Sequence, residues 1–136
     1  MPLSEYRYLR RVQFADTDAA GVVHFSWIVK YMEEAEHALW REAGLTIAPV
    51  DGIVGYPRVA LSVDFKAPLH FEEEFNVHVR IEAISRRTIR YAHTIRRGET
   101  VIATGTMTAA CVRKVPPPMT SIEIPPDVLE RLSSHT

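Results

Sequence analysis

Two aspartates stand two positions apart, Asp16 and Asp18, just before a glycine and the start of a long amphipathic segment. A carboxylate ahead of a helix lies beside backbone N–H groups that have no partner within that helix. Such donors stabilise a carbonyl oxygen that gains negative charge, while the carboxylate activates water or attacks the carbonyl carbon itself. Gly21 would let a substrate approach the backbone closely. The pattern is compatible with acyl transfer to water, although Asp-x-Asp before a helix is more often a capping and turn device.

These groups need an element to hold them, and the sequence predicts a helix over residues 25–43. Apolar residues recur there at intervals of three and four, which lines one face, and Gly44 supplies a stop. Residues 6–14 alternate loosely between aromatic or branched side chains and arginines, as on a strand with one wet face. Residues 15–24 hold turn formers and are expected to form a loop. The candidate chemistry therefore lies between a strand and a long helix.

The second half of the chain has the alternating pattern of strands. Residues 45–57 contain prolines and glycines and are expected to form a loop, after which the apolar period changes from helical to two. Four runs follow, at about residues 58–66, 75–82, 87–96 and 100–112. Their short gaps favour hairpins, and a short helix begins after a proline at about 126–133. We therefore predict one α+β domain over residues 1–136, with a five-stranded antiparallel sheet wrapped round one long helix.

Composition and charge exclude several classes of partner. The formal net charge of −1 gives no basic field for nucleic acid or an anionic membrane. No apolar run approaches the ~20 residues that a membrane-spanning helix needs, and the N-terminus has no apolar signal-peptide core. The single cysteine, Cys111, leaves no internal disulfide and fits a reducing compartment. We therefore expect a cytoplasmic protein that binds neither nucleic acid nor membrane.

Other kinds of catalytic site are not indicated. The six histidines show no His-x-x-x-His pair and no His/Cys cluster with ligand spacing, so no metal is expected. The chain has no glycine-rich phosphate loop and no Gly-x-Ser-x-Gly elbow of the serine hydrolases. The Asp16–Gly21 stretch remains the main candidate for chemistry.

A longer stretch, FADTDAAGVVHFSWIVKYMEEAEHALWREAGL, resembles the signature of the 4-hydroxybenzoyl-CoA thioesterase family of hot-dog proteins. The matching residues are Asp16, Asp18, Gly21, Val22, Val23, Tyr31, Glu34 and Gly44. The resemblance continues through VALSVDFKAPLHFEEEFNVHVRIEAISRRTIRYAHTI, which includes the corner at Ala67-Pro68, and covers residues 8 to about 130.

The resemblance implies a hot-dog fold and the hydrolysis of an acyl-CoA or aroyl-CoA thioester to the free acid and CoA, without a cofactor. Asp18 matches the family's catalytic carboxylate, acting as nucleophile or general base. The backbone N–H at about Phe25 matches the donor that polarises the thioester carbonyl. Arg86 and Arg87 lie where family members place basic residues against the nucleotide phosphates of CoA, although a solvated turn is an equal alternative. The resemblance also implies a homodimer or homotetramer with sites shared between subunits.

Three further positions bear on the acyl group. Leu61 and Ser62, on a strand expected to face the helix, are weaker candidates for lining the acyl pocket. His24 stands where many relatives carry tyrosine or phenylalanine, and we hypothesise that it contacts the acyl group.

In a different branch of hot-dog thioesterases, a glutamate on the long helix does the chemistry. This chain offers Glu33, Glu34 and Glu36, which are expected on the solvated face of the helix or at a subunit contact.

Other functions stay open at this point. The chain could be a hydratase or dehydratase acting on thioesters, although its Asp18 and His24 are not a clear match to the Asp/His pair of that branch. It could bind acyl-CoA without turnover, or hydrolyse a thioester on an acyl carrier protein rather than on CoA. A pure binder would gain nothing from an unpaired carboxylate beside a thioester, which favours the enzyme.

Overall fold

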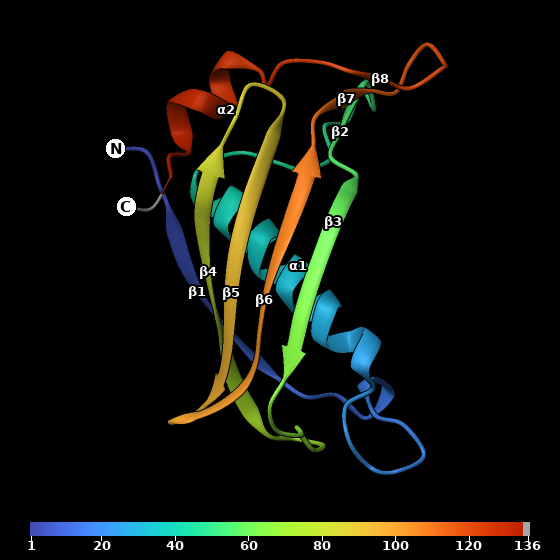
Figure 1. The fold of residues 1–136 in the computed structure, drawn as a ribbon, viewed down its shortest axis with the longest axis vertical. Coiled ribbons are helices and arrows are strands. Elements are labelled where there is room, and N and C mark those ends of the chain that lie inside the picture. The colour runs from blue at the N-terminus through green and yellow to red at the C-terminus, as the bar shows by residue number, and fades with distance from the viewer. Residues whose placement is uncertain (135–136) are drawn as a thin grey trace.

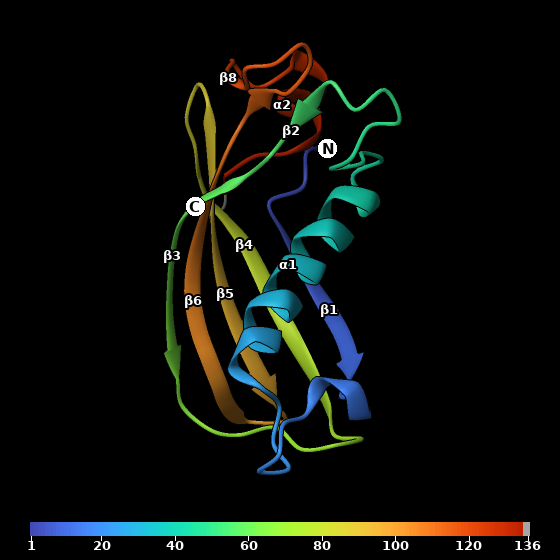
Figure 2. The same ribbon diagram turned by 90° about the vertical axis from the view of Figure 1, so that its right-hand side faces the viewer.

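The computed structural model describes residues 1–134 of the chain (Figure 1). Five strands form the main sheet in the order β1-β4-β5-β6-β3, with antiparallel neighbours throughout. They are β1 (Glu5–Arg11), β3 (Arg58–Phe65), β4 (Glu74–Ile84), β5 (Thr88–Arg97) and β6 (Thr100–Ala110). The long helix α1 (Phe25–Glu42) lies across one face of this sheet (Figure 2). The predicted α+β hot-dog architecture is confirmed.

The core lies between the apolar stripe of α1 and the inner face of the sheet. Buried members of that stripe are Ile28, Tyr31, Met32, Ala35 and Leu39. Alternate residues of the strands face them, among them Val77, Val79, Ile81, Tyr91, Ile95 and Met107. The spacings of three to four on the helix and of two on the strands thus bring both apolar sets to one interface.

The helix ends as its sequence predicts. Gly44 takes a φ of +80°, and the Leu45 N–H donates to the Trp40 carbonyl oxygen at 2.8 Å, which closes the last turn. Residue 44 has the left-handed backbone that favours glycine. The predicted C-terminal helix is also present, as α2 (Pro126–Arg131).

Three local features differ from the sequence-based expectations. The first strand ends at Arg11, and the chain then makes a 3-10 turn, η1 (Phe14–Asp16), because the Asp16 carboxylate accepts the Gln13 N–H and closes that turn. The predicted loop at 45–57 contains β2 (Val54–Gly55). That strand pairs with β7 (Val112–Arg113), which pairs in turn with β8 (Thr120–Ser121), in a small second sheet. Strands this short carry too little alternation to be recognised in a sequence.

Strand β3 is an edge of the main sheet and pairs only with β6 among the described residues. Three of its apolar side chains stay exposed: Val59 by 61%, Leu61 by 52% and Phe65 by 56%. Helix α1 makes its main contacts with β1 and β4, at the other side of the sheet. It therefore does not cover the exposed side chains of β3. No helix within residues 1–134 is long and apolar enough to cross a membrane.

Candidate active site

Asp18 lies on a small hairpin that joins β1 and η1 to the start of α1. Its N–H donates to the Val22 carbonyl oxygen at 2.9 Å, and its own carbonyl oxygen accepts from the Gly21 N–H at 3.0 Å. Thr17 and Val23 form the next bridge of this hairpin. Gly21 takes a φ of +84°, a conformation that strains any residue with a side chain. Gly21 therefore shapes the turn that presents Asp18, and the predicted close approach of a substrate to its backbone stays a prediction.

One oxygen of the Asp18 carboxylate is held by the backbone and the other is free. Oδ1 accepts from the Ala20 N–H at 2.8 Å and, more weakly, from the Val22 N–H at 3.4 Å. This turn fixes the direction of the side chain. Oδ2 accepts no hydrogen bond from the part of the chain that the structure describes. A half-buried carboxylate thus keeps one oxygen for another group.

The first turn of α1 leaves one amide without a partner. His24 is the N-cap, and its Nδ1 accepts from the Ser26 N–H at 3.2 Å while its carbonyl oxygen accepts from the Trp27 N–H at 2.9 Å. The Phe25 N–H, at the first helical position, has no acceptor within residues 1–134. This donor stands at the positive end of the helix dipole.

Asp18 and Phe25 meet at one surface depression of about 320 Å³. Its other lining residues are Val22, Val23, Ile28, Phe65, Lys66, Ala67, Pro68 and Leu69. A second depression, of about 500 Å³, adjoins it, since Phe25 and Phe65 line both. Leu61, Val29 and Val63 make that second depression apolar. The two together form a groove with a carboxylate and a helix N-terminus at one end and an apolar bed at the other.

This arrangement fits the chemistry of acyl transfer to water. A carbonyl carbon beside Asp18 could be attacked by the carboxylate or by water that the carboxylate activates. Negative charge then grows on the carbonyl oxygen, where an unpaired N–H at a helix start lowers its energy. The apolar bed would accept an apolar acyl group.

Of the other predicted pocket residues, one lines the groove of this chain and two do not. Leu61 lines the apolar depression, whereas Ser62 lies in a depression on the opposite face of the sheet, because successive strand residues alternate between faces. The His24 ring caps α1 and stacks on Phe25, with 4.4 Å between ring centroids, and does not line the groove. Strand alternation thus takes Ser62 away from the groove of this chain, and capping holds the His24 ring at the helix start. A contact of either side chain with the acyl group stays a prediction.

Arg86 and Arg87 lie at the β4–β5 turn, at the opposite end of the sheet from the Asp18 hairpin (Figure 1). The Arg86 guanidinium is exposed and pairs with Glu123, whose pKa it lowers through a hydrogen bond and its charge. Within a single chain, the structure does not bring the two arginines to the aspartate.

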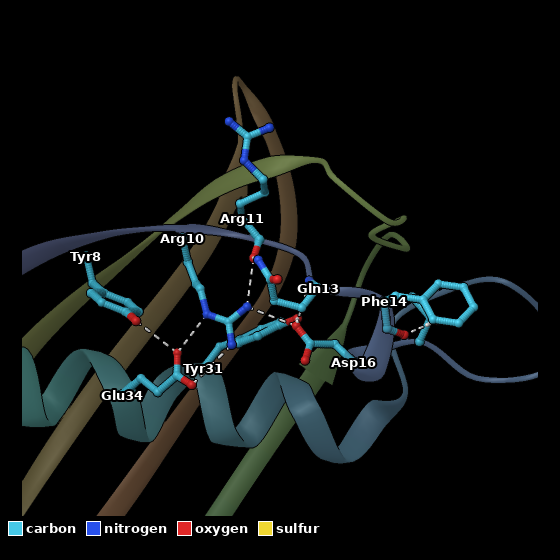
Figure 3. A network of polar contacts seen from close by, with 9 residues as sticks. Tyr8, Arg10, Arg11, Gln13, Phe14, Asp16, Tyr31 and Glu34 are labelled. Atoms are coloured by element: carbon cyan, nitrogen blue, oxygen red, sulfur yellow. Dashed lines mark hydrogen bonds and ion pairs between the residues drawn. The ribbon is translucent and has the colours of Figure 1, made fainter.

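Asp16, the other half of the Asp-x-Asp pair, is 1% exposed, and protein donors hold one of its two carboxylate oxygens. Its Oδ2 accepts from the Gln13 N–H, from Arg10 and from the Tyr31 hydroxyl (Figure 3). The sequence carried no signal for this network, because Arg10 and Tyr31 come from different elements.

The expectation for the helix glutamates was wrong for Glu36. Glu36 is completely buried, where it forms an ion pair with Arg58 and accepts a hydrogen bond from His93 Nε2 at 2.7 Å. Glu34 is half-buried and pairs with Arg10 at 3.1 Å. Residues 58 and 93 are remote in sequence from the helix, so helical spacing alone could not reveal these partners. A substrate cannot reach Glu36, which leaves Asp18 as the accessible carboxylate at the groove.

Comparison with known proteins gives a consistent result. The model of the thioesterase-like superfamily matches residues 12–132. A putative esterase from Aquifex aeolicus is 33% identical over 129 residues, which cover 92% of this chain and 95% of that protein. A 1,4-dihydroxy-2-naphthoyl-CoA hydrolase from Parasynechococcus marenigrum is 34% identical over 105 residues, 71% of this chain and 69% of that one.

Solved structures agree with the family match. The crystal structure of a 1,4-dihydroxy-2-naphthoyl-CoA thioesterase from Synechocystis superposes with a TM-score of 0.82 at 26% identity, over 90% of this chain and 91% of that chain. Sequence, fold and groove thus lead to one assignment: the chain belongs to the thioesterase-like superfamily.

Proposed function

We propose that this protein hydrolyses an acyl-CoA or aroyl-CoA thioester to the free acid and CoA. Asp18 acts as nucleophile or general base, and the Phe25 N–H polarises the thioester carbonyl. The observation that carries the proposal is the pairing of a carboxylate with a free oxygen and an unpartnered helix-start amide at one groove. The reaction needs only water and these two groups.

The acyl group is proposed to be aromatic. Phe25 and Phe65 stand where the two depressions join, and aromatic rings pack favourably edge-to-face or offset against one another. Relatives named for 1,4-dihydroxy-2-naphthoyl-CoA support the same class of substrate. A flat aroyl group would lie over Leu61 and Val29 with its thioester towards Asp18.

The working form is proposed to be a homodimer, with a homotetramer as a further assembly. Support comes from strand β3, whose outer edge is unpaired and whose exposed Leu61 and Phe65 continue into the groove. Exposed, apolar edge strands readily pair with another strand, and a two-fold axis pairs two copies of the same edge antiparallel. The second copy would then wall the groove, which is open in one chain.

The same pairing would bring Arg86 and Arg87 of a partner to the Asp18 end. In one chain the two sites are separated by the length of β4, whose 11 residues span about 36 Å at ~3.3 Å each. An antiparallel partner presents its β4–β5 turn at the opposite end, beside this chain's hairpin. Its guanidinium groups could then hold the CoA phosphates. We propose these two arginines as a CoA site acting across subunits.

Residues 1–136 are proposed to act as one domain in a reducing, cytoplasmic setting. The family match covers residues 12–132 without a break, which supports a single unit. The only cysteine, Cys111, is buried and unpaired, and burial raises the pKa of its thiol, so it stays protonated and unreactive.

The proposal is tested by thiol release from a panel of benzoyl, hydroxybenzoyl, naphthoyl and aliphatic CoA thioesters, with the corresponding acyl-carrier-protein thioesters alongside. We expect aroyl-CoA turnover to exceed aliphatic turnover, with Asp18→Asn lowering the rate. Binding of acyl-CoA without turnover would favour a sensor, and activity only on carrier-protein thioesters would replace CoA as the substrate. Hydration of an enoyl thioester without hydrolysis would move the assignment to the hydratase branch.

A further inference from the structure

The hairpin that carries Asp18 is tied to the rest of the molecule at Asp16. The Asp16 carbonyl oxygen accepts from the His24 N–H at 2.9 Å, and this bond closes the base of the hairpin. His24 is also the N-cap of α1, so the same bond connects the hairpin to the helix start. The position of Asp18 relative to the Phe25 N–H therefore depends on where Asp16 is held.

Three elements converge on one oxygen of Asp16. Oδ2 accepts from the Tyr31 hydroxyl of α1 at 2.6 Å, from Arg10 Nη1 of β1 at 2.9 Å and from the Gln13 N–H at 3.0 Å (Figure 3). Tyr31 is fully buried, and burial together with its bond to Asp16 raises the pKa of its hydroxyl, so it remains a proton donor. A buried carboxylate with several donors has one strongly preferred position.

Arg10 is itself held by a second carboxylate, that of Glu34. Burial opposes its charge, but the hydrogen bonds and charges of Glu34 and Asp16 outweigh that effect and raise its pKa. Its guanidinium lies 4.9 Å from the centroid of the Tyr31 ring. Tyr8 donates to Glu34 at 3.0 Å and completes the network without touching Asp16.

We propose that Tyr31 is a positioning residue that acts through Asp16. Its hydroxyl links the second turn of α1 to the base of the hairpin and so sets Asp18 against the Phe25 N–H at the same helix. Misplacing a reacting group by about 1 Å can cost on the order of 100-fold in rate. Tyr31 does not line the groove, so we expect substrate binding to change little. The proposal rests on the thioester hydrolysis proposed above.

The test compares Tyr31→Phe with two matched variants. Tyr91→Phe also removes a buried hydroxyl, one that accepts from Trp40 Nε1 at 2.9 Å in a region that does not contact the hairpin. Tyr8→Phe removes a hydroxyl from the same network, at Glu34. We expect Tyr31→Phe to lower kcat by roughly 10- to 100-fold with KM within two-fold. Both controls should keep kcat within two-fold, with Tyr91→Phe losing thermal stability as Tyr31→Phe does.

A second readout does not depend on activity. Amide hydrogen exchange at His24 and Asp18 should quicken in Tyr31→Phe and stay unchanged in Tyr91→Phe, since both amides are bonded within the hairpin. An unchanged kcat in Tyr31→Phe, or an equal loss in Tyr91→Phe, overturns the positioning role. If the wild type hydrolyses no thioester, the proposed function fails, and unchanged exchange in Tyr31→Phe would separately overturn the anchoring through Asp16.

Discussion

Asp16 and Asp18 carry the same functional group two residues apart but have opposite surroundings. Asp16 is enclosed and ion-paired with Arg10 at 2.9 Å, whereas Asp18 is half-buried and its Oδ2 accepts no hydrogen bond from residues 1–134. The buried member serves the fold and the accessible member is available for chemistry. Sequence spacing alone treats the two as equal.

This difference predicts that the two aspartates contribute unequally to the stability of the fold. Asp16→Ala leaves the buried Tyr31 hydroxyl without its acceptor and leaves Arg10 with the carboxylate of Glu34, and an unsatisfied buried donor costs about 1–3 kcal/mol. Asp18→Ala removes only a turn contact, for which we expect about 1 kcal/mol or less. Urea unfolding of both variants measures the two losses. Equal losses would show that Asp16 is not the structural member of the pair.

His78 gives the molecule a predictable loss of stability in mild acid. Burial and the charges of Arg7 and Arg80 lower its pKa, against an opposing hydrogen bond to Glu5. Between this lowered value and the unfolded value of about 6.5, the unfolded chain binds more protons, so folding stability falls as pH drops. We expect His78→Gln to lose less stability than the wild type between about pH 7 and 5, as measured by urea unfolding. An equal loss in both proteins would assign the acid sensitivity to other groups.

At the scale of elements, the sequence predicts those helices and strands whose residues show a clear apolar period. Helix α1 and the five main strands are long enough for their apolar pattern to be read, and they occur close to the predicted ranges. The strands β2, β7 and β8 have two residues each, and pairing between remote segments defines them. No local pattern reveals such pairs.

Partners that are distant in the chain explain what the sequence could not show of the site. The loop that carries Asp18 and its place before α1 follow from local turn residues and were predicted, although the hairpin bridge between Thr17 and Val23 was not. The burial of Asp16 depends on Arg10 and Tyr31, and that of Glu36 depends on a histidine 57 positions away. Whether a carboxylate is structural or accessible is thus a property of the folded sheet and helix together.

At the scale of the whole molecule, we expect that pairing two copies at the β3 edge also closes the open groove. Leu61 lies on both the edge strand and the apolar depression, so a charge there should block pairing of two copies. We expect Leu61→Asp to sediment as a monomer and to lose thioesterase activity. Leu129→Asp, which alters an equally exposed leucine on α2, should retain the wild-type mass. A monomeric wild type with full activity would exclude the shared groove.

The central claim is that the Asp18 carboxylate carries out hydrolysis of a CoA thioester. Its most direct test is kcat for the best aroyl-CoA substrate, measured for the wild type, Asp18→Asn and the control Asp64→Asn, which alters a carboxylate on the other face of the sheet. We expect kcat to fall by about 10²–10⁴ in Asp18→Asn, the size expected for a lost general base, and to stay unchanged in Asp64→Asn. Undiminished turnover in Asp18→Asn would contradict the claim.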